Sequence, residues 1–445
     1  MPQISNKKQM KKLGILVQYC DTRKDVPLLI KELSEFFEVV LFGSHSELKK
    51  VDLCLEKRTI QPRKRNLHNR TLNVLYACFG SLPYSRKNFE NWLRYRRRKI
   101  KSPSLRFRQS IIDWLRIHCG NLLKFDSYVR WLEGSDNAKI NDIDFFLSLT
   151  DLCNVALVSE ILSAKKTYLT YVYSWDHVAK QHQYLKHGTH YLTWHHGMTQ
   201  DLIREHNICA NRISVVGSSQ MALVEPSIKR AKDNPTSTPK DYVYYGASTG
   251  APEFAEQEKL VIKFIAECLK KISPSTTLLV RPYPFAIEMN LYGDLLQLQN
   301  VRIDNISASD GSILFQQDSM EEKYGKIRDA KIFMHMGSTI GLEAAYFSTP
   351  TVMLAMEDFD YGIAPENPRH LPKLFDQPHI QNYLLSSSEP NIIRTEGQLL
   401  PRLLVMMKDP HKFLNYNKEF QNTLPLSSMR EIAVAISNVT GDNPN

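Results

Sequence analysis

The stretch His335-Met-Gly-Ser-Thr-Ile-Gly-Leu-Glu-Ala-Ala-Tyr-Phe-Ser-Thr-Pro-Thr-Val-Met353 joins two apolar runs through a turn of small residues. Residues 331–336 are mostly apolar and predict a buried strand, and the small residues 337–339 predict a turn. Residues 341–346 favour a helix, and residues 351–356 favour a second buried strand. The stretch therefore predicts a β-α-β unit whose helix begins at the carboxyl end of the first strand.

The start of this predicted helix is suited to an anion. Free backbone N–H groups and the positive end of the helix dipole meet there, and they would stabilise a phosphate at Gly337, Ser338 and Thr339. Glu343 lies about one helical turn further on, where a carboxylate accepts hydrogen bonds from ribose hydroxyls. Ordinary capping of a helix explains the same residues without a ligand. The local chemistry therefore indicates either a holder for a nucleotide diphosphate or a capped helix.

The same residues resemble the donor-binding signature of GT-B glycosyltransferases, His/Ser-x-Gly-Ser-Thr-x-x-x-Glu-Ala followed by x-x-Pro-x-Val. The matching residues are His335, Gly337, Ser338, Thr339, Glu343, Ala344, Pro350 and Val352. Ser348 departs from the signature, because many members have Gly two residues before the Pro. The resemblance implies an α/β protein of the GT-B fold, two Rossmann-like domains with a cleft between them. It also implies that His335, the turn and Glu343 bind a nucleotide-sugar donor.

The length of the chain and the order of its predicted strands and helices indicate two domains. The 445 residues exceed the roughly 250–300 at which a single core stops growing. We expect an N-terminal acceptor-side domain over 1–225, a linker rich in Pro, Lys, Asp, Ser and Thr over 226–241, and a nucleotide-sugar-binding domain over 242–426. By the resemblance, the helix and tail over 427–445 cross back to the first domain.

Apolar runs alternate with helix-like segments, which predicts mostly parallel, buried sheets. The predicted strands of the first domain cover 13–19, 38–42, 72–79, 145–149, 155–158, 168–173, 191–194 and 213–216. Those of the second domain cover 242–245, 278–280, 331–336 and 351–354, and its predicted helices cover 252–271, 320–328 and 398–407.

Positive charge is concentrated in one segment of the first domain. Residues 57–130 hold 19 Lys and Arg and three acidic residues, a net charge of +16, whereas the whole chain carries +10. The basic, aromatic part of the segment, about 87–130, predicts a helical insertion. Trp92 with Arg96, Arg97 and Arg98 suits an anionic membrane surface, where each cation contributes about 1 kcal/mol. A nucleic-acid patch and a solvated helix face are the alternatives, and we favour the membrane over nucleic acid.

A second chemical cluster follows two predicted strands of the first domain. Asp176 comes after the strand 168–173, and His195 and His196 come after the strand 191–194. A carboxylate or an imidazole at such a strand end is a candidate base for an acceptor hydroxyl. The Trp-His-His-Gly run resembles the Trp-His-Gly segment of glycerol- and ribitol-phosphate polymerases, where the His is the base. The resemblance favours His196, which precedes Gly197, and side chains that only stitch loops together remain the alternative.

The second domain offers further donor contacts. Gly246 and Ser248 follow one predicted strand, where small residues let the backbone approach a phosphate. Arg281 ends another strand and provides a cationic fork for bidentate contact, or else a structural ion pair. The two Asp-x-Asp pairs, at 142–144 and 358–360, have a spacing that arises easily by chance. We therefore expect no cofactor and no metal, with basic side chains neutralising the leaving diphosphate.

These patterns together predict a cytoplasmic enzyme, peripheral on the inner face of the cell membrane. The seven cysteines contain no Cys-x-x-Cys pair, residues 1–12 lack the apolar core of a signal peptide, and no apolar run is long enough to span a membrane. The expected reaction moves a sugar from a nucleotide-sugar donor to a lipid-linked acceptor of a surface polysaccharide, such as capsule or lipopolysaccharide. The alternatives are a polyol-phosphate (CDP-glycerol-type) transferase, a non-catalytic nucleotide-sugar-binding subunit and a basic scaffold for nucleic acid.

Overall fold

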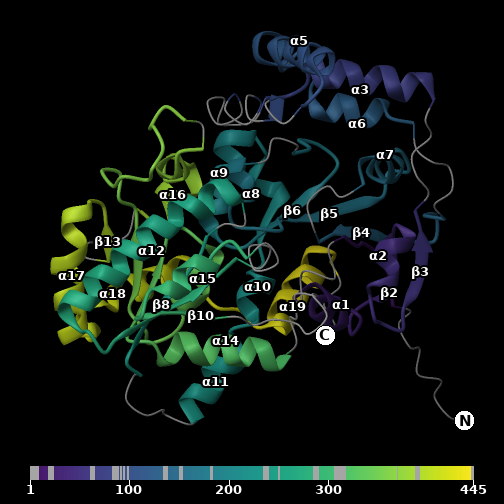
Figure 1. The fold of residues 1–445 in the computed structure, drawn as a ribbon. Helices are drawn as coiled ribbons and strands as arrows, with labels where there is room; N and C mark the ends of the chain where they lie inside the picture. The colour runs from purple at the N-terminus through teal and green to yellow at the C-terminus, as the bar shows by residue number, and fades with distance from the viewer. Residues whose placement is uncertain are drawn as a thin grey trace, which may run out of the picture. The chain divides into compact units, whose positions relative to one another are not determined.

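The computed structural model describes residues 10–18, 25–60, 66–82, 90, 93, 96–97, 100–133, 139–149, 154–180, 184–233, 240–248, 251–283, 290–304, 317–367, 369–385 and 391–441. The chain divides into two compact units (Figure 1). Unit 1 comprises Met1–Ala222 and Ser427–Asn445, and unit 2 comprises Leu223–Leu426.

Unit 1 is built on a seven-stranded parallel sheet with the order β3-β2-β1-β4-β5-β6-β7. The order runs outward in both directions from β1, as in doubly wound α/β folds. Its strands are β1 (Lys12–Leu16), β2 (Glu38–Gly43), β3 (Glu56–Thr59), β4 (Phe145–Ser148), β5 (Thr167–Tyr171), β6 (His190–Thr193) and β7 (Ile213–Val215).

Unit 2 repeats this plan with a six-stranded parallel sheet, in the order β10-β9-β8-β11-β12-β13. The strand order changes direction between β8 and β11: β9 and β10 follow on one side of β8, and β11, β12 and β13 follow on the other. Its strands are β8 (Tyr242–Gly246), β9 (Thr277–Arg281), β10 (Val301–Ile303), β11 (Ile332–His335), β12 (Thr351–Leu354) and β13 (Ile392–Ile393). The predicted fold class, α/β with two Rossmann-like domains, is confirmed by the two sheets.

Helices cover the sheets of both units. Those of unit 1 are α1 (Asp25–Leu33), α2 (His45–Lys49), α3 (Leu67–Phe79), α5 (Pro103–Cys119), α6 (Phe125–Trp131), α7 (Val155–Ser163), α8 (His177–Lys180), α9 (His196–His206), α10 (Ser219–Ala222) and α19 (Met429–Val439), with the 3-10 turn Ala210–Arg212. Those of unit 2 are α11 (Glu225–Asp233), α12 (Pro252–Ile272), α14 (Gln317–Asp329), α15 (Thr339–Ala344), α16 (Pro378–Tyr383), α17 (Glu396–Lys408) and α18 (Asn415–Thr423), with the 3-10 turns Gly293–Gln297, Leu371–Leu374 and Pro410–Phe413.

The last helix, α19, belongs to unit 1, where it packs against α1 and α10. A capping box fixes its start: the Ser428 hydroxyl accepts from the N–H of Glu431, whose carboxylate accepts from the N–H of Ser428. Across the part of the chain that the structure describes, we find no helix long and apolar enough to cross a membrane.

Two segments predicted as strands are helices. Residues 72–79 belong to α3, and residues 155–158 belong to α7. In each case an asparagine caps the helix start: Asn66 accepts from the N–H of Asn69 at 2.9 Å, and Asn154 accepts from the N–H of Leu157 at 3.1 Å. Only one face of each helix is therefore buried: Leu72 and Tyr76 of α3 pack into the core, whereas Val74 and Leu75 are exposed.

The predicted linker also differs from the structure. Residues 225–233 form α11, and Arg230 of this helix pairs with Glu321 of α14 at 2.6 Å within unit 2. Pro226 does not prevent the helix, because a proline in the first turn removes an N–H that has no intrahelical partner. Residues 234–239 of the predicted linker lie outside the described residues.

Candidate functional site

Three of the predicted donor-binding residues lie at the same level of the unit 2 sheet. Gly246, the last residue of β8, is in register with His335 at the end of β11 on one side and with Arg281 at the end of β9 on the other. Because β8 and β11 flank the point where the strand order reverses, these residues lie at the topological switch point. Ligands of open α/β sheets bind outside the carboxyl ends of the strands at this point.

The turn between β11 and α15 brings its backbone close to β8. Gly337 has a φ of 86°, which favours glycine, and its N–H donates to Nδ1 of His335 at 3.1 Å. Ser338 begins the helix, and its hydroxyl donates to the carbonyl of Gly246 at 3.4 Å. A Cβ at Gly246 would lie 2.5 Å from Cγ2 of Ile340, so glycine is required for this approach. The N–H of Gly341, in the first turn of α15, donates to the carbonyl of Ser338 at 3.0 Å, which closes the turn onto the helix.

His335 is a neutral, enclosed imidazole beneath this turn. Its side chain is 0% exposed, and burial lowers its pKa to about 3. Because Nδ1 accepts the Gly337 hydrogen bond, the ring hydrogen resides on Nε2. Among the described residues, Nε2 has no hydrogen-bond partner. The α15 backbone lies against the ring, since a Cβ at Gly341 would be 2.3 Å from Nδ1. His335 therefore fixes the shape of the turn.

Glu343 has an internal partner that the sequence analysis missed. The carboxylate is buried and forms an ion pair with Lys323 of α14, itself a buried residue. Burial lowers the pKa of Lys323, although Glu343 acts to raise it. A lysine within an ordinary amphipathic stretch offers no sequence signal for such a pairing. The predicted ribose contact of Glu343 stays a prediction, and Lys323 is its ion-pair partner inside the protein.

Arg281 also takes part in an internal charge cluster. It pairs with the buried carboxylate of Asp304 at 3.0 Å, and Lys326 pairs with the same carboxylate at 2.6 Å. The hydroxyl of Tyr244 donates to it as well. Burial acts to raise the pKa of Asp304, but Arg281 and Lys326 outweigh burial and hold this pKa below its usual value. Arg281 therefore forms the structural ion pair that the sequence analysis gave as the alternative to a donor contact.

Ser248 is held by a buried glutamate. Both its N–H and its hydroxyl donate to Oε1 of Glu258 at 2.9 Å, and Tyr245 donates to the same oxygen at 2.8 Å. Tyr292 donates to Oε2 of Glu258 at 2.8 Å. Burial raises the pKa of Glu258, whose side chain is 0% exposed. The loop after β8 is therefore fixed from inside, by a residue that the sequence analysis did not single out.

In unit 1, the three candidate bases follow two neighbouring strands. Asp176 lies in the turn between β5 and α8, and His195 and His196 lie where β6 leads into α9. Because β5 and β6 pair in parallel, both turns lie at the carboxyl edge of the same sheet. Asp176 is half-buried. The structure thus brings the predicted candidates to one edge of unit 1.

The two histidines of this turn have different environments. His195 is buried and caps α9, with its Nδ1 accepting from the N–H of Gly197 at 3.2 Å. Burial, together with the neighbouring His196, lowers the pKa of His195 to about 4, so it is neutral near pH 7. His196 is exposed at the first position of α9. Accessibility to a substrate hydroxyl therefore favours His196 over His195 as a base.

The basic segment is partly tied to the protein itself. Arg96 and Arg97 pair with the buried Asp113 of α5 at 2.9 and 3.2 Å. Two other residues predicted to contact a membrane, Trp92 and Arg98, lie outside the described residues. Arg96 and Arg97 are therefore anchored by an internal carboxylate, which lessens the charge they offer to an external partner.

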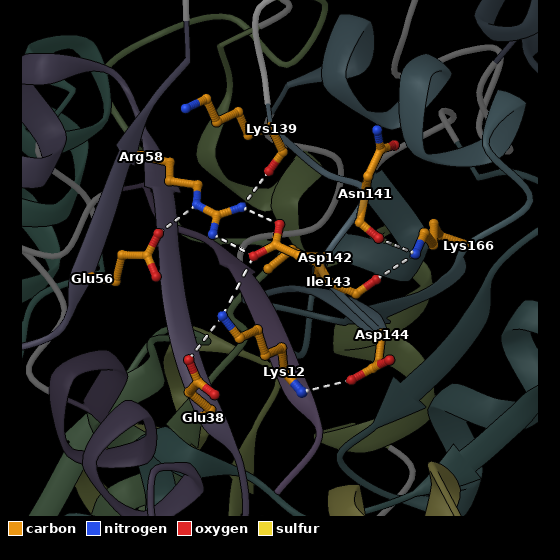
Figure 2. Close-up of polar contacts among 10 residues, drawn as sticks. All are labelled: Lys12, Glu38, Glu56, Arg58, Lys139, Asn141, Asp142, Ile143, Asp144 and Lys166. Atoms are coloured by element: carbon orange, nitrogen blue, oxygen red, sulfur yellow. Dashed lines mark hydrogen bonds and ion pairs between the residues drawn. The ribbon is translucent and has the colours of Figure 1, made fainter. Parts of the chain in front are cut away.

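The two Asp-x-Asp pairs have structural partners. Asp142 binds the guanidinium of Arg58 at 2.6 Å, which holds its pKa well below the usual range, and Asp144 accepts from the N–H of Lys12 at 2.8 Å (Figure 2). These contacts lie at the amino ends of β1 and β4, the edge opposite to the candidate bases. Asp358 and Asp360 accept backbone N–H groups at 2.8 and 2.9 Å. Within the described ranges, no group of three or more His, Cys, Asp or Glu is placed to hold a metal ion.

No protein-family model matches the chain, and no curated protein matches its sequence. Several solved structures resemble it along nearly its whole length. The UDP-GlcNAc 2-epimerase of Methanocaldococcus jannaschii is 11% identical with a TM-score of 0.48, covering 97% of this chain and 100% of that one. A glycosyltransferase of Rickettsia africae is 8% identical with a TM-score of 0.49, covering 97% of both chains. The wall teichoic acid polymerase TagF is 9% identical with a TM-score of 0.49, covering 97% of this chain and 88% of that one. With scores below 0.5 these likenesses say nothing about activity, and the two parallel sheets themselves establish the fold class.

Proposed function

We propose that the chain is a glycosyltransferase that uses a nucleotide-sugar donor. Unit 2 would bind the donor, with the diphosphate at Gly337, Ser338 and Thr339 and the ribose near Glu343. The observation that carries the proposal is the register of Gly246, Arg281 and His335 at the switch point of a parallel sheet. The glycine-built turn lets backbone amides approach the phosphates, as the sequence resemblance to the GT-B donor signature implies.

The cationic side chains beside this turn support an anionic ligand. Arg281, Lys323 and Lys326 lie beside two buried carboxylates, Asp304 and Glu343. Lys326 also pairs with Glu322, so the three cations have three carboxylate partners, and a diphosphate would compete with these carboxylates for the cations. The cations are already fixed by their internal partners, so they need little reorganisation when a ligand binds. This arrangement also supports a reaction without a metal ion, which stays part of the proposal.

Unit 1 would supply the base. His196 is exposed on the first turn of α9, and its imidazole would take the proton of an acceptor hydroxyl. Buried His195 would hold the turn in shape through its Gly197 hydrogen bond. Asp176 is the second candidate base, because it follows the neighbouring strand. The acceptor in this proposal is a lipid-linked surface glycan at the inner face of the cell membrane.

The experiment that tests the donor site is a thermal-stability screen with UDP-, GDP-, CDP- and CMP-linked sugars. A ligand at 100 times its dissociation constant stabilises the folded state by about 2.7 kcal/mol. Arg281→Gln should reduce this ligand-induced shift, measured against the unliganded variant. Arg302→Gln is the matched control, because Arg302 is exposed on the adjacent strand β10 and should leave the shift unchanged. Equal shifts in both variants would contradict the assigned donor site.

A polyol-phosphate transferase is the second candidate, and the Trp194-His195-His196-Gly197 run favours it. CDP-glycerol in the same screen discriminates the two, since stabilisation by CDP-glycerol alone would select the polyol-phosphate reaction. A non-catalytic subunit would show the donor shift with no turnover in either the wild type or the His196→Gln variant.

A further inference from the structure

Helix α5 carries its large apolar side chains on its outer face. Phe107, Ile111 and Trp114 are 68%, 46% and 57% exposed. Their spacing of four and three residues aligns them along one face of the helix. The buried residues of α5 are instead Asp113 and Arg116. This is the reverse of an ordinary surface helix, which turns its apolar stripe toward the core.

The inner face of α5 is fixed by polar contacts. Asp113 is 1% exposed and accepts from Arg96 at 2.9 Å and from Gln109 at 2.7 Å. Arg116 donates to the carbonyls of Tyr76 and Ser81. Rotating the helix to bury its apolar face would expose these groups and break their bonds. The orientation of α5 is therefore set by its polar face, and core packing does not account for the apolar one.

Basic residues flank the exposed apolar face. Arg106 and Arg108 are both exposed, and 3.6 residues per turn place them roughly 100° to either side of Phe107. Lys101 and Lys124, beyond the two ends of α5, are exposed as well. The exposed surface of this helix thus combines aromatic, aliphatic and cationic side chains.

The acidic residue within α5 and the next one along the chain both have partners inside the protein. Asp113 is buried beneath the helix, as described above, and Asp126 at the start of α6 accepts from the N–H groups of Lys186 and His187 at 3.0 Å. Within α5 itself, all of whose residues are described, Asp113 is the single acid. No negative charge on the outer face of α5 therefore opposes an anionic partner. Figure 1 shows α3, α5 and α6 grouped together at the top of the view, above the strands of unit 1.

We propose that the outer face of α5, defined by Phe107, Ile111 and Trp114 with Arg106 and Arg108, docks on an anionic lipid surface. Aromatic rings settle at the level of the headgroups, an aliphatic side chain enters the acyl boundary, and Arg108 pairs with lipid phosphates, whereas the guanidinium of Arg106 also donates to the carbonyl of Ile100. The charge complementarity selects an anionic membrane rather than a neutral apolar partner. The membrane contact predicted for residues 92–98 is thus assigned to α5. The docking surface rests on the proposed function only in one respect, that docking would give the enzyme access to a lipid-linked acceptor.

Flotation with vesicles of phosphatidylcholine, with and without phosphatidylglycerol, tests this surface on the full chain. The wild type should float with the anionic vesicles and much less with the neutral ones. Phe107→Ser combined with Trp114→Ser should lower the partition coefficient at least about tenfold, because both rings leave the interface. Lys101→Gln combined with Arg108→Gln should lower it about fivefold for each charge removed.

Two control variants match these changes elsewhere on the surface. Leu404→Ser with Val405→Ser removes two apolar side chains of α17 that are 40% and 48% exposed. Lys270→Gln with Lys271→Gln removes two exposed cations of α12. Both controls should float like the wild type, and all variants should keep its circular dichroism spectrum. If the controls lose as much binding as the α5 variants, the effect is unspecific and the inference is wrong.

Other partners would give distinct results. A wild type that does not float, but sediments as a dimer that the Phe107→Ser and Trp114→Ser variant turns into a monomer, would show a second copy on this face and overturn the inference. Binding of single-stranded RNA without binding to vesicles would overturn it too. Turnover of a water-soluble acceptor without flotation would contradict the docking surface and leave the proposed function intact. Flotation without donor binding would contradict the proposed function and leave the docking surface intact.

Discussion

The turns that follow β6 in unit 1 and β11 in unit 2 share one local device. In both, a buried histidine accepts the N–H of a glycine two residues later: His195 from Gly197 at 3.2 Å, and His335 from Gly337 at 3.1 Å. Burial makes both rings neutral, with pKa values of about 4 and about 3. Each bond shapes the entry into a helix, α9 or α15.

The turns differ in what they present to solvent. The residue between histidine and glycine is the exposed His196 in unit 1, and the buried Met336 in unit 2. Gly337 is in the left-handed region with a φ of 86°, whereas Gly197 is already the second residue of α9. The unit 1 turn therefore offers a titratable side chain, and the unit 2 turn offers mainly backbone. The same hydrogen bond supports a candidate base in one unit and a candidate phosphate holder in the other.

The largest difference should appear in turnover. His196→Gln is expected to lower turnover by about 10²–10⁴-fold, the usual contribution of a general base, while the donor-induced thermal shift persists. The assay uses the donor found in the thermal screen. Asp176→Asn, measured in parallel, decides between the two candidate bases. Unchanged turnover in His196→Gln would remove the chemical role of the unit 1 turn.

Acid should destabilise both turns through their buried histidines. Each folded pKa lies below the unfolded value of about 6.5, so the unfolded state binds protons that the folded state excludes. Stability should fall as pH drops below about 6.5, by about 2 kcal/mol for each ring at pH 5. Urea unfolding at several pH values measures this loss. His195→Asn and His335→Asn keep an acceptor at the position of Nδ1, and each should reduce the pH dependence of the free energy of unfolding. A variant that keeps the full pH dependence would show that the replaced ring does not cause it.

Exchanging the residues between histidine and glycine in the two turns should lower the free energy of unfolding in one turn only. Met336→His places a polar ring at a position 2% exposed and should destabilise unit 2 by about 1–3 kcal/mol. His196→Met replaces an exposed side chain and should change stability by less than about 0.5 kcal/mol. Denaturant unfolding of both variants checks the prediction. Equal costs would mean that the exposure of the two middle positions is not what distinguishes the turns.

The smallest effect concerns the two glycines. Gly337→Ala should cost about 1–2 kcal/mol, because an L-residue is strained in the left-handed region. Its Cβ would also lie 2.8 Å from Cδ1 of Ile380. Gly197→Ala, within a helix, should be neutral or slightly stabilising. Thermal unfolding of the pair measures the difference, and a Gly197→Ala variant as damaged as Gly337→Ala would contradict the contrast in backbone geometry.

Much of the fold could be predicted because buried parallel strands are continuous apolar runs. β11 and β12 follow from residues 331–336 and 351–354 in this way. The edge strand β3 was missed, because Glu56-Lys-Arg-Thr59 is polar and is held by pairing with β2. β13 was missed because a strand of two residues has no periodicity. The helices α3 and α7 were misassigned where an asparagine cap outweighed an apolar run.

The candidate site was predictable only in part. Small residues and histidines after apolar runs indicated the two turns, since chain order alone places them at strand ends. The buried partners carried no comparable signal: Lys323 and Asp304 reach the site across helices and strands distant in the sequence. Such pairings depend on the packing of α14 beside the sheet, which local patterns do not encode.

The α/β class, the two-domain organisation, the two His-x-Gly turns and the basic character of residues 57–130 could all be derived from the amino-acid sequence. Each of these follows from local composition and periodicity, which act within one element. The three-dimensional structure was needed to show which histidine is exposed, which cations are already paired, and that α5 turns Phe107 and Trp114 outward. Burial and ion pairing depend on residues that are distant in the sequence, so local patterns do not contain this information. Asp113 accepts from Arg96, and Arg116 donates to the carbonyl of Tyr76, and these hydrogen bonds fix the orientation of α5.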